Sequence, residues 1–276
     1  MHMESWKMIV FERQKGVPKF ECHEYKEKTS DYVVLIPIIN EGERILKELE
    51  RAEQHNVADY ADIVICDGGS SDGCTEPEHL QRLHVNTLLV KRDTGKQGAQ
   101  LRMGMYWALK RGYKGLITID GNNKDSIEDV PHFIDKLKEG YALIQGSRFI
   151  DGGRAINTPP VRALAVRLVH APIISLAAGQ RFTDTTNAFR GYSAEYLADE
   201  RVKPLRDIFA TYELLAYLSV RATQLGYRAC EIPVTRAYPG TEKVPTKISF
   251  FKGNAELLKI LFKTALGLYA PGKSKE

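Results

Sequence analysis

The 276-residue sequence has only four cysteines, and none of them stands at a metal-type spacing. Cys22, Cys66, Cys74 and Cys230 are scattered, so we predict reduced structural thiols rather than a zinc site or a disulfide framework. The first eleven residues hold no apolar run of signal-peptide length, and we expect no segment of membrane-spanning length. These absences predict a cytosolic protein.

Nucleotide motifs of the common kinds are also missing. No Gly-x-Gly-x-x-Gly follows an expected strand, and Asp93-Thr-Gly95-Lys96 does not fit the P-loop spacing, so neither a dehydrogenase nor an NTPase is supported. The formal charge of +4 is too small to indicate nucleic acid. Locally, Lys243, Lys247 and Lys252 can meet an anionic membrane surface or a phosphate group.

Short apolar strands alternate with helical patterns along the chain, which predicts an α/β fold with a mostly parallel central sheet. The expected strands are Tyr32–Ile36, Asp62–Cys66, Val85–Val90, Gly115–Ile119 and Tyr141–Gln145. Apolar residues at helical spacing mark helix faces at Ile45–Ala52, Ala99–Tyr106 and Val130–Leu137. The first thirty residues are expected to form a leading arm or hairpin.

The fourth of these strands ends in a cluster of oxygen ligands, Asp120-Gly-Asn122-Asn-Lys-Asp125. A carboxylate and an amide two residues apart suit Mg²⁺ or Mn²⁺, which leave coordination positions open for substrate phosphates. An ordinary turn is the alternative for such a short motif. We predict that Asp120 and Asn122 bind a divalent metal, which would grip a nucleotide diphosphate.

Polar loops also follow the first three expected strands. They read Pro37-Ile-Ile-Asn40-Glu41, Asp67-Gly-Gly-Ser-Ser-Asp72-Gly73 and Asp93-Thr-Gly95-Lys96-Gln-Gly98. Asp67 and Asp72 can accept hydrogen bonds from a ribose and a base edge, although Asx-turns or helix caps remain the alternative for Asn40 and Asp72. Lys96 can add a charge beside a phosphate at a helix start, or it is simply solvated surface.

Taken in order, these motifs and Gly146-Ser147-Arg148 resemble glycosyltransferase family 2. The similarity runs from Tyr32 to Ser249 and is most like the dolichol-phosphate mannose synthase branch and its bacterial polyprenyl-phosphate relatives. Its further motifs are Gly152-Gly153, Pro159-x-x-Arg162, Asp184-Thr-Thr-Asn-Ala-Phe189-Arg190 and Glu231-Ile-Pro233-Val. The resemblance implies a GT-A type nucleotide-binding sandwich, a GDP- or UDP-sugar donor and a divalent cation.

The resemblance also implies roles for single residues. It places the donor's nucleoside near Pro37, Asn40, Glu41, Asp67 and Asp72, with Lys96 nearby, and the metal on Asp120 and Asn122. Ile39 stands where the family usually has tyrosine, and Gly68 replaces an acidic residue, so the base cannot be carried over. Asn122 replaces a second aspartate, which predicts a weaker metal site unless Asp125 compensates.

The reaction that the resemblance implies inverts the anomeric configuration. Charge on the departing diphosphate would be stabilised by the metal, Arg148 and Lys96. A sugar-hydroxyl acceptor needs a base, for which Asp184 and Glu213 are the candidates, whereas a lipid phosphate is already ionised. Candidate cations for a phosphate acceptor are Arg148, Arg162, Arg190, Arg236, Lys243 and Lys247, with plain solubility as the alternative. Residues 238–249 are predicted to form a lid over the acceptor.

We therefore divide the chain into an arm (1–30), a GT-A domain (31–247) and a C-terminal amphipathic helix with a tail (248–276). That helix and residues 161–178 can lie in a bilayer interface, or they pack onto the domain or a second subunit. His170 is interpreted as structural.

The leading hypothesis is an inverting hexosyltransferase that loads a polyprenyl phosphate at the cytosolic membrane face. Transfer to a sugar hydroxyl, in cell-surface polysaccharide or glycolipid synthesis, is the alternative. A non-catalytic nucleotide-sugar binder also stays open. A nucleotidyltransferase is disfavoured, because its glycine-rich loop should follow the first strand.

Overall fold

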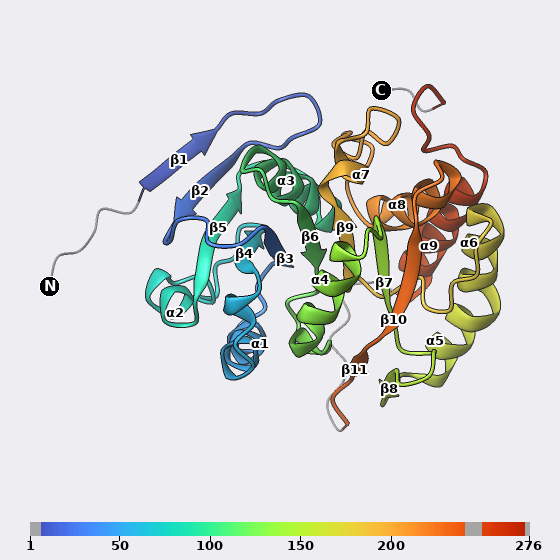
Figure 1. Cartoon of the computed structure of the whole chain (residues 1–276), viewed down its shortest axis with the longest axis horizontal. Helices are drawn as coiled ribbons and strands as arrows, with labels where there is room; N and C mark the ends of the chain where they lie inside the picture. The colour runs from blue at the N-terminus through green and yellow to red at the C-terminus, as the bar shows by residue number, and fades with distance from the viewer. Residues whose placement is uncertain (1–6, 241–249, 274–276) are drawn as a thin grey trace, which may run out of the picture.

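A nine-stranded sheet runs through the centre of the chain in the order β1-β2-β5-β4-β3-β6-β9-β7-β10 (Figure 1). The computed structural model describes residues 7–240 and 250–273. The strands are β1 (Lys7–Phe11), β2 (Phe20–Glu24), β3 (Tyr32–Ile38), β4 (Asp62–Asp67), β5 (Val85–Lys91), β6 (Gly115–Thr118), β7 (Leu143–Ser147), β8 (Arg154–Ile156), β9 (Arg190–Ser193), β10 (Ala229–Pro233) and β11 (Thr235–Ala237). Short β8 and β11 form a separate parallel pair.

Helices cover both faces of this sheet and enclose two cores. They are α1 (Glu43–Gln54), α2 (Pro77–Arg82), α3 (Gln97–Lys110), α4 (Val130–Lys138), α5 (Pro160–Ala165), α6 (Ala171–Ala178), α7 (Ala194–Ala198), α8 (Glu213–Gln224) and α9 (Phe250–Ala265). One core packs α1, α2 and α4 on the sheet, and the other packs α3, α6, α7, α8 and α9 on the opposite face. This three-layer α/β arrangement confirms the predicted fold class.

Parallel pairing dominates the middle of the sheet. Strands β5, β4, β3 and β6 are parallel neighbours, and β7 is parallel to β10. All six residues of β4 are buried, as expected for a parallel strand covered on both faces. The antiparallel strand β9, which lies between β6 and β7, was not predicted.

The five predicted strands correspond to β3 through β7, with shifts at their ends. The largest shift is in β7, which begins at Leu143 rather than at Tyr141. Gly140 adopts φ +85 after α4, and the Tyr141 amide donates back to the Lys136 carbonyl oxygen. Tyr141 therefore belongs to the end of the helix.

The N-terminal segment forms a hairpin that extends the main sheet. Strands β1 and β2 pair antiparallel, and β2 pairs antiparallel with β5. Phe20 and Cys22 of β2 are fully buried in the core, and the Phe20 ring stacks on Phe11 at a centroid distance of 4.5 Å. These residues are therefore part of the sheet's edge.

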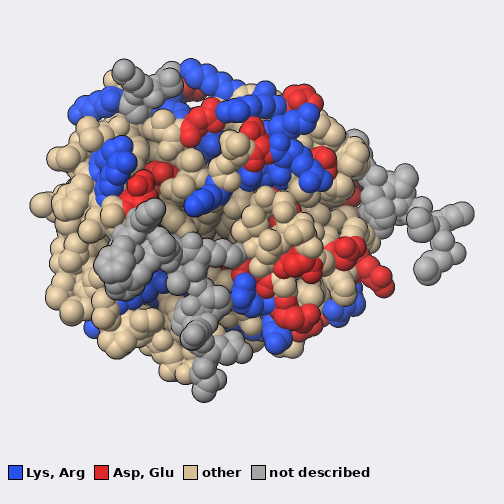
Figure 2. All heavy atoms as spheres, turned by 180° about the vertical axis from the view of Figure 1, so that it is seen from behind, with Lys and Arg blue, Asp and Glu red and all other residues tan. Residues whose placement is uncertain are grey.

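Residues Pro160–Ala178 form one long helix made of α5, a π-helical turn at Val166–His170, and α6. By length and composition it can cross a membrane, so our expectation that no segment has that length was wrong. Only a narrow stripe, including Ile174, packs inward, whereas Leu168 and Leu176 are 66% and 86% exposed. The side formed by α5, α6 and α9 lies at the left edge of Figure 2, where few charged side chains are seen.

The C-terminal helix α9 packs against α6 and α8, so the packing alternative holds for its inner face. Ile260 and Leu261 are buried there. Its outer face and the turn that follows expose Leu258, Phe262, Leu266 and Leu268. Helix α9 therefore adds a second apolar strip to the outer surface beside α6.

Candidate active site

The predicted motif loops meet at one edge of the sheet. Strands β4, β3 and β6 are adjacent and parallel, so the loops that follow them leave from the same side. The side-chain amide of Gln100 donates to the carbonyl oxygens of Ile38 and Cys66, at 2.5 and 2.9 Å, and so ties the ends of β3 and β4 together. The loop positions are fixed relative to one another by the sheet itself.

Asn40 and Asp72 join the loops after β3 and β4 to each other. The Asn40 side-chain oxygen accepts from the Ser71 amide at 2.8 Å, and the Asp72 carboxylate accepts from the Gly42 amide at 2.8 Å. These bonds agree with the turn-and-cap alternative, in which the two side chains shape the loops. Direct contact of Asn40 and Asp72 with a nucleoside stays a prediction.

Asp67 is 1% exposed, and its carboxylate accepts hydrogen bonds from within its own loop. Its carboxylate accepts from the Gly69 amide at 2.9 Å and from the Ser70 hydroxyl at 2.6 Å. Glu41 forms an ion pair with Arg44 at 2.7 Å. If Asp67 or Glu41 contacts a nucleoside, the same carboxylate must also keep or give up these contacts within the protein. Pro37 lies within β3, paired with Cys66 of β4.

The start of α3 brings a residue to Asp120 that the sequence interpretation missed. The Gln97 side-chain amide donates to the Asp120 carboxylate at 2.7 Å. Lys96, the residue before α3, is exposed, and its backbone amide is held by the Ala210 carbonyl at 2.8 Å. Gln97 is thus the part of this predicted phosphate loop that faces the predicted metal ligand.

The loop Asp120–Asp125 is pressed against β3 and α1. A Cβ atom at Gly121 would lie 2.4 Å from an Ile38 methyl group, so this close approach requires glycine. From α1, the fully buried Glu48 carboxyl accepts from the Asn123 amide at 2.7 Å. Burial raises the pKa of Glu48 well above its usual value. The buried carboxyl of Glu48 therefore holds the backbone of this loop against α1.

The donor atoms of this loop fit a hard divalent cation. Within the described residues, the side-chain oxygen of Asn122 is buried without a hydrogen-bond partner, and the Asp120 carboxylate is 22% exposed. No group of three or more histidine, cysteine, aspartate and glutamate side chains capable of holding a metal occurs in residues 7–240 and 250–273. One carboxylate and one amide oxygen suit Mg²⁺ or Mn²⁺ only if a substrate or water supplies the other ligands.

Arg236 of β11 lies directly against the predicted metal ligand. Its guanidinium contacts the Asp120 carboxylate at 3.2 Å and forms a close ion pair with the buried Asp125. Burial raises the pKa of Asp125 to about 6, although Arg236 acts in the opposite direction. Arg236 itself is 6% exposed. Our prediction of an acceptor-binding Arg236 did not anticipate this pairing with two aspartates.

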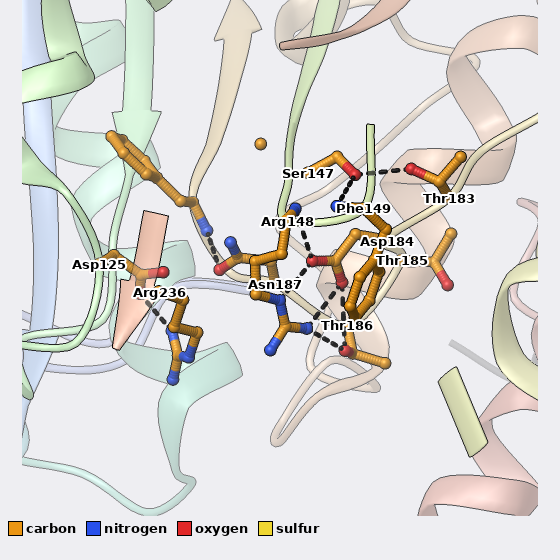
Figure 3. A network of polar contacts seen from close by, with 12 residues as sticks. Asp125, Ser147, Arg148, Phe149, Thr183, Asp184, Thr185, Thr186, Asn187 and Arg236 are labelled. Atoms are coloured by element: carbon orange, nitrogen blue, oxygen red, sulfur yellow. Dashed lines mark hydrogen bonds and ion pairs between the residues drawn. The ribbon is translucent and has the colours of Figure 1, made fainter. Parts of the chain in front are cut away.

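Arg148 and Asp184 form a second buried ion pair (Figure 3). Two guanidinium nitrogens of Arg148 donate to the two Asp184 oxygens at 2.5 and 2.8 Å, and the residues are 4% and 0% exposed. Glu231 fixes the Asp184 loop by accepting from the Thr183 amide at 2.8 Å. This geometry gives no support to Asp184 as a free base or to Arg148 as a free phosphate-binding cation.

Arg190 and Glu213 are likewise engaged within the protein. The Arg190 guanidinium is 1% exposed and donates to the Leu215 carbonyl and the Ser219 hydroxyl. Glu213 accepts from the Thr211 amide and hydroxyl, both at 2.7 Å. We predicted an acceptor role for Arg190 from its motif, but the structure places its guanidinium in the core. Lys243 and Lys247, with most of the predicted lid, lie outside the described residues.

Tyr238, just beyond β11, lies among three cationic side chains, which form a positively charged corner of the site. The cationic groups of Lys124, Arg162 and Arg236 lie 5.2, 5.9 and 5.7 Å from the centre of its ring. Burial alone would raise the pKa of Tyr238, but Arg162 and Arg236 outweigh it and the pKa is lowered. Arg162 is exposed on α5, so this corner joins the aspartate site to the apolar helix.

Comparison with known proteins finds relatives in sequence, although no protein-family model matches the chain. The chain is 28% identical to polyprenol monophosphomannose synthase of Mycolicibacterium smegmatis, over 75% of this chain and 77% of the relative. It is 25% identical to undecaprenyl-phosphate mannosyltransferase of Micrococcus luteus, over 74% and 82%. It is also 25% identical to dolichyl-phosphate hexose transferase of Haloferax volcanii, over 86% and 94%.

Solved structures share the fold of this chain. Glucosyl-3-phosphoglycerate synthase from Mycobacterium tuberculosis, solved with Mn²⁺, uridine diphosphate and phosphoglyceric acid, matches with a TM-score of 0.58 and 16% identity. The match covers 90% of this chain and 80% of that one, and at this identity it shows a shared fold. The chain therefore has the GT-A fold. Its sequence relatives, which are named as a mannose synthase, a mannosyltransferase and a hexose transferase, make it a glycosyltransferase. Its relatives confirm the resemblance to glycosyltransferase family 2 and to the polyprenyl-phosphate branch.

His170 generates a pH prediction. Its ring contacts the Thr185 hydroxyl at 2.6 Å, and burial, together with Arg190, lowers its pKa from 6.5 to about 4. The unfolded chain then binds more protons between these values, so stability is present above pH 6.5 and is lost as the pH falls towards 4. Through this group, the wild type should lose about 2 kcal/mol of unfolding free energy between pH 7 and pH 5. We expect His170→Gln to lack this loss, as measured by urea unfolding. Equal pH dependence in both proteins would contradict this.

Proposed function

We propose that this glycosyltransferase moves a sugar from a nucleotide diphosphate sugar to a polyprenyl phosphate at a membrane surface, with inversion at the anomeric carbon. The main support has two parts. Both candidate bases are engaged within the protein, Asp184 by Arg148 and Glu213 by Thr211, and the cationic corner around Tyr238 includes Arg162 of the apolar helix. An ionised phosphate needs positioning rather than deprotonation. This arrangement therefore favours a phosphate acceptor over a sugar hydroxyl.

The donor would bind at the ends of β3, β4 and β6. Asp120 and Asn122 would hold Mg²⁺ or Mn²⁺, which supplies Lewis-acid stabilisation of the departing diphosphate when bound. The solved relative in fold that carries Mn²⁺ and uridine diphosphate supports this assignment. The chain's own part is to fix the ligands, which Gln97 and Glu48 do through Asp120 and the neighbouring Asn123 amide.

Positive side chains near Asp120 would add to the stabilisation of the leaving group. We assign this role to Lys124 and Arg236 in preference to Arg148, whose guanidinium is bound to Asp184. Burial lowers the pKa of Lys124, and Arg236 lowers it further. A cation that is only partly solvated interacts more strongly with a developing negative charge than one in water.

The acceptor would enter from the helix side. Its phosphate would meet Arg162, whose guanidinium can bind two phosphate oxygens at once, and its prenyl chain would lie along the outer face of Pro160–Ala178. The relatives named for polyprenol, undecaprenyl and dolichyl phosphates support such an acceptor. Arg190 is left out of this proposal because it is buried.

Membrane association would come from the same surface. Val161, Leu164, Leu168 and Leu176 are 76%, 58%, 66% and 86% exposed, and the outer faces of α9 and the following turn add further exposed apolar residues. Arg162 and Arg167 add positive charge on the same helix. Apolar side chains flanked by basic ones favour a peripheral position in the interface of an anionic bilayer.

Asp120 is the residue to test for the metal. We expect Asp120→Ala to lower the Mn²⁺-dependent transfer rate by about 100-fold or more, because the diphosphate charge loses its stabilisation. A thermal-shift screen of nucleotide diphosphate sugars would first identify the donor, and transfer would then be timed with radiolabelled sugar. The urea midpoint should hardly change, and Asp151→Ala, at an exposed aspartate, is the control. Unchanged activity of Asp120→Ala would remove the metal assignment.

Arg162 is the residue to test for the acceptor. We expect Arg162→Ala to raise the KM for a short polyprenyl phosphate by about tenfold, since a charge-assisted contact to phosphate is lost. The KM for the donor should stay within twofold, and Arg181→Ala, also exposed, should leave both unchanged. If both KM values rise equally, Arg162 does not bind the acceptor. If Asp184 or Glu213 proves essential as a base, a hydroxyl acceptor is favoured instead.

Vesicle binding tests the membrane surface. We expect Leu168→Asp to lower the partition coefficient of the protein onto sedimented anionic phospholipid vesicles by about 30-fold, because a buried leucine contributes roughly 2 kcal/mol. Val10→Asp is the matched control, at a 46% exposed position in β1 on the opposite side of the molecule (Figure 1). Equal binding of the two variants would place the membrane contact elsewhere.

A further inference from the structure

Arg236 contacts both carboxylates of the Asp120–Asp125 loop. One terminal nitrogen lies 3.2 Å from Asp120, and the other forms the close ion pair with Asp125. Asp125 is fully buried, so this ion pair must form for its charge to be tolerated. The contact with Asp120 is longer and borders solvent, since the Asp120 side chain is 22% exposed. The ion pair of Arg236 with Asp125 is therefore stronger than its contact with Asp120.

Both oxygens of Asp120 are already hydrogen-bonded, one by Gln97 and the other by Arg236. Of these two donors, only Arg236 carries a charge. The buried oxygen of Asn122, which has no partner within the described residues, shows that the neighbouring ligand position is unsatisfied. A divalent cation on Asp120 and Asn122 would stand next to the guanidinium, and two like charges repel strongly at such a distance.

We infer that Arg236 is the resident counter-ion of Asp120 and that a divalent metal must displace its guanidinium from this carboxylate. The inference rests on the proposed metal site. It assigns to Arg236 a role that its place in the sequence after Glu231-Ile-Pro233-Val did not indicate. When displaced from Asp120, the guanidinium keeps its ion pair with Asp125 and stays beside the site.

The backbone around Arg236 is held firmly, so only its side chain needs to move. The Ser126 amide donates to the Thr235 carbonyl at 3.0 Å, and the Ala237 amide donates to the Lys124 carbonyl at 2.8 Å. Asp125 and Arg236 face each other as a bridge pair between these bonds. A rotation of the side chain can release Asp120 while β11 remains paired. Metal affinity is then set by competition with Arg236.

The test is the affinity of the full chain for Mn²⁺ alone, measured by the electron paramagnetic resonance signal of the free ion. We expect Arg236→Gln to bind Mn²⁺ at least about tenfold more tightly than the wild type, because the competing charge is gone. Arg236→Lys keeps a cation and should stay near the wild-type affinity. Arg154→Gln removes an exposed cation from the paired strand β8 and controls for general charge effects.

A double variant separates the loss of competition from two side effects of the single substitution. Arg236→Gln leaves Asp125 buried without its partner, which can unfold the loop or offer the metal an extra carboxylate. Asp125→Asn combined with Arg236→Gln removes that carboxylate and should also bind Mn²⁺ more tightly than the wild type. Tighter binding in both variants, with Arg236→Lys and Arg154→Gln near the wild type, supports the inference.

The remaining outcomes separate this inference from the proposed function. If the double variant, which leaves no buried charge without a partner, binds Mn²⁺ no more tightly than the wild type, Arg236 does not compete and the inference is overturned. The proposed metal site survives that result if Asp120→Ala weakens Mn²⁺ binding in the same assay. If Asp120→Ala binds Mn²⁺ like the wild type, the metal site and the inference fail together.

Discussion

A charge that is removed from water must be paired, and this constraint shapes the end of the sheet where the site lies. Arg148 pairs with Asp184, and Arg236 pairs with Asp125 and reaches Asp120. Each pair joins segments that are far apart in the sequence, so together they connect the strand ends, the Asp184 loop and β11. Breaking one partner would leave a buried charge alone, which costs about 3–5 kcal/mol. These ion pairs therefore help the strands to hold the loops in place.

The sheet could be predicted from the sequence because its signal is local. Fully buried parallel strands such as β4 appear as short apolar runs, and helix faces appear as apolar residues every three or four positions. The antiparallel strand β9 was missed because its four residues, Arg190–Ser193, begin with a charged residue and include a glycine. Its strand character comes from β6 and β7 on either side, which no local pattern reveals.

The site was predicted less completely, for a related reason. The position of Asp120 after a buried strand correctly placed it where the motif loops meet, and the Asn122 oxygen there has no partner within the described residues. The partners of the arginines could not be read from the sequence, because residues 125 and 236 are brought together only by the fold. Arg190 belongs to a motif that suggested an exposed role, yet its guanidinium is surrounded by carbonyl and hydroxyl oxygens of the core. Glu48 could have been found, since it shares a helix face with Ile45, Leu49 and Ala52.

The π-helical turn at Val166–His170 has a consequence for the outer helix. Such a turn takes in one residue more than an α-helical turn, and each residue of an α-helix rotates the following side chains by about 100°. The wider turn absorbs the extra residue, so the half of the helix that carries Leu164 and the half that carries Ile174 and Leu176 keep their relative orientation. Deleting a single residue within this turn would convert it to an α-helical turn and leave Ile174 facing the core. The π turn therefore lets this helix carry one more residue without reorienting its apolar surface.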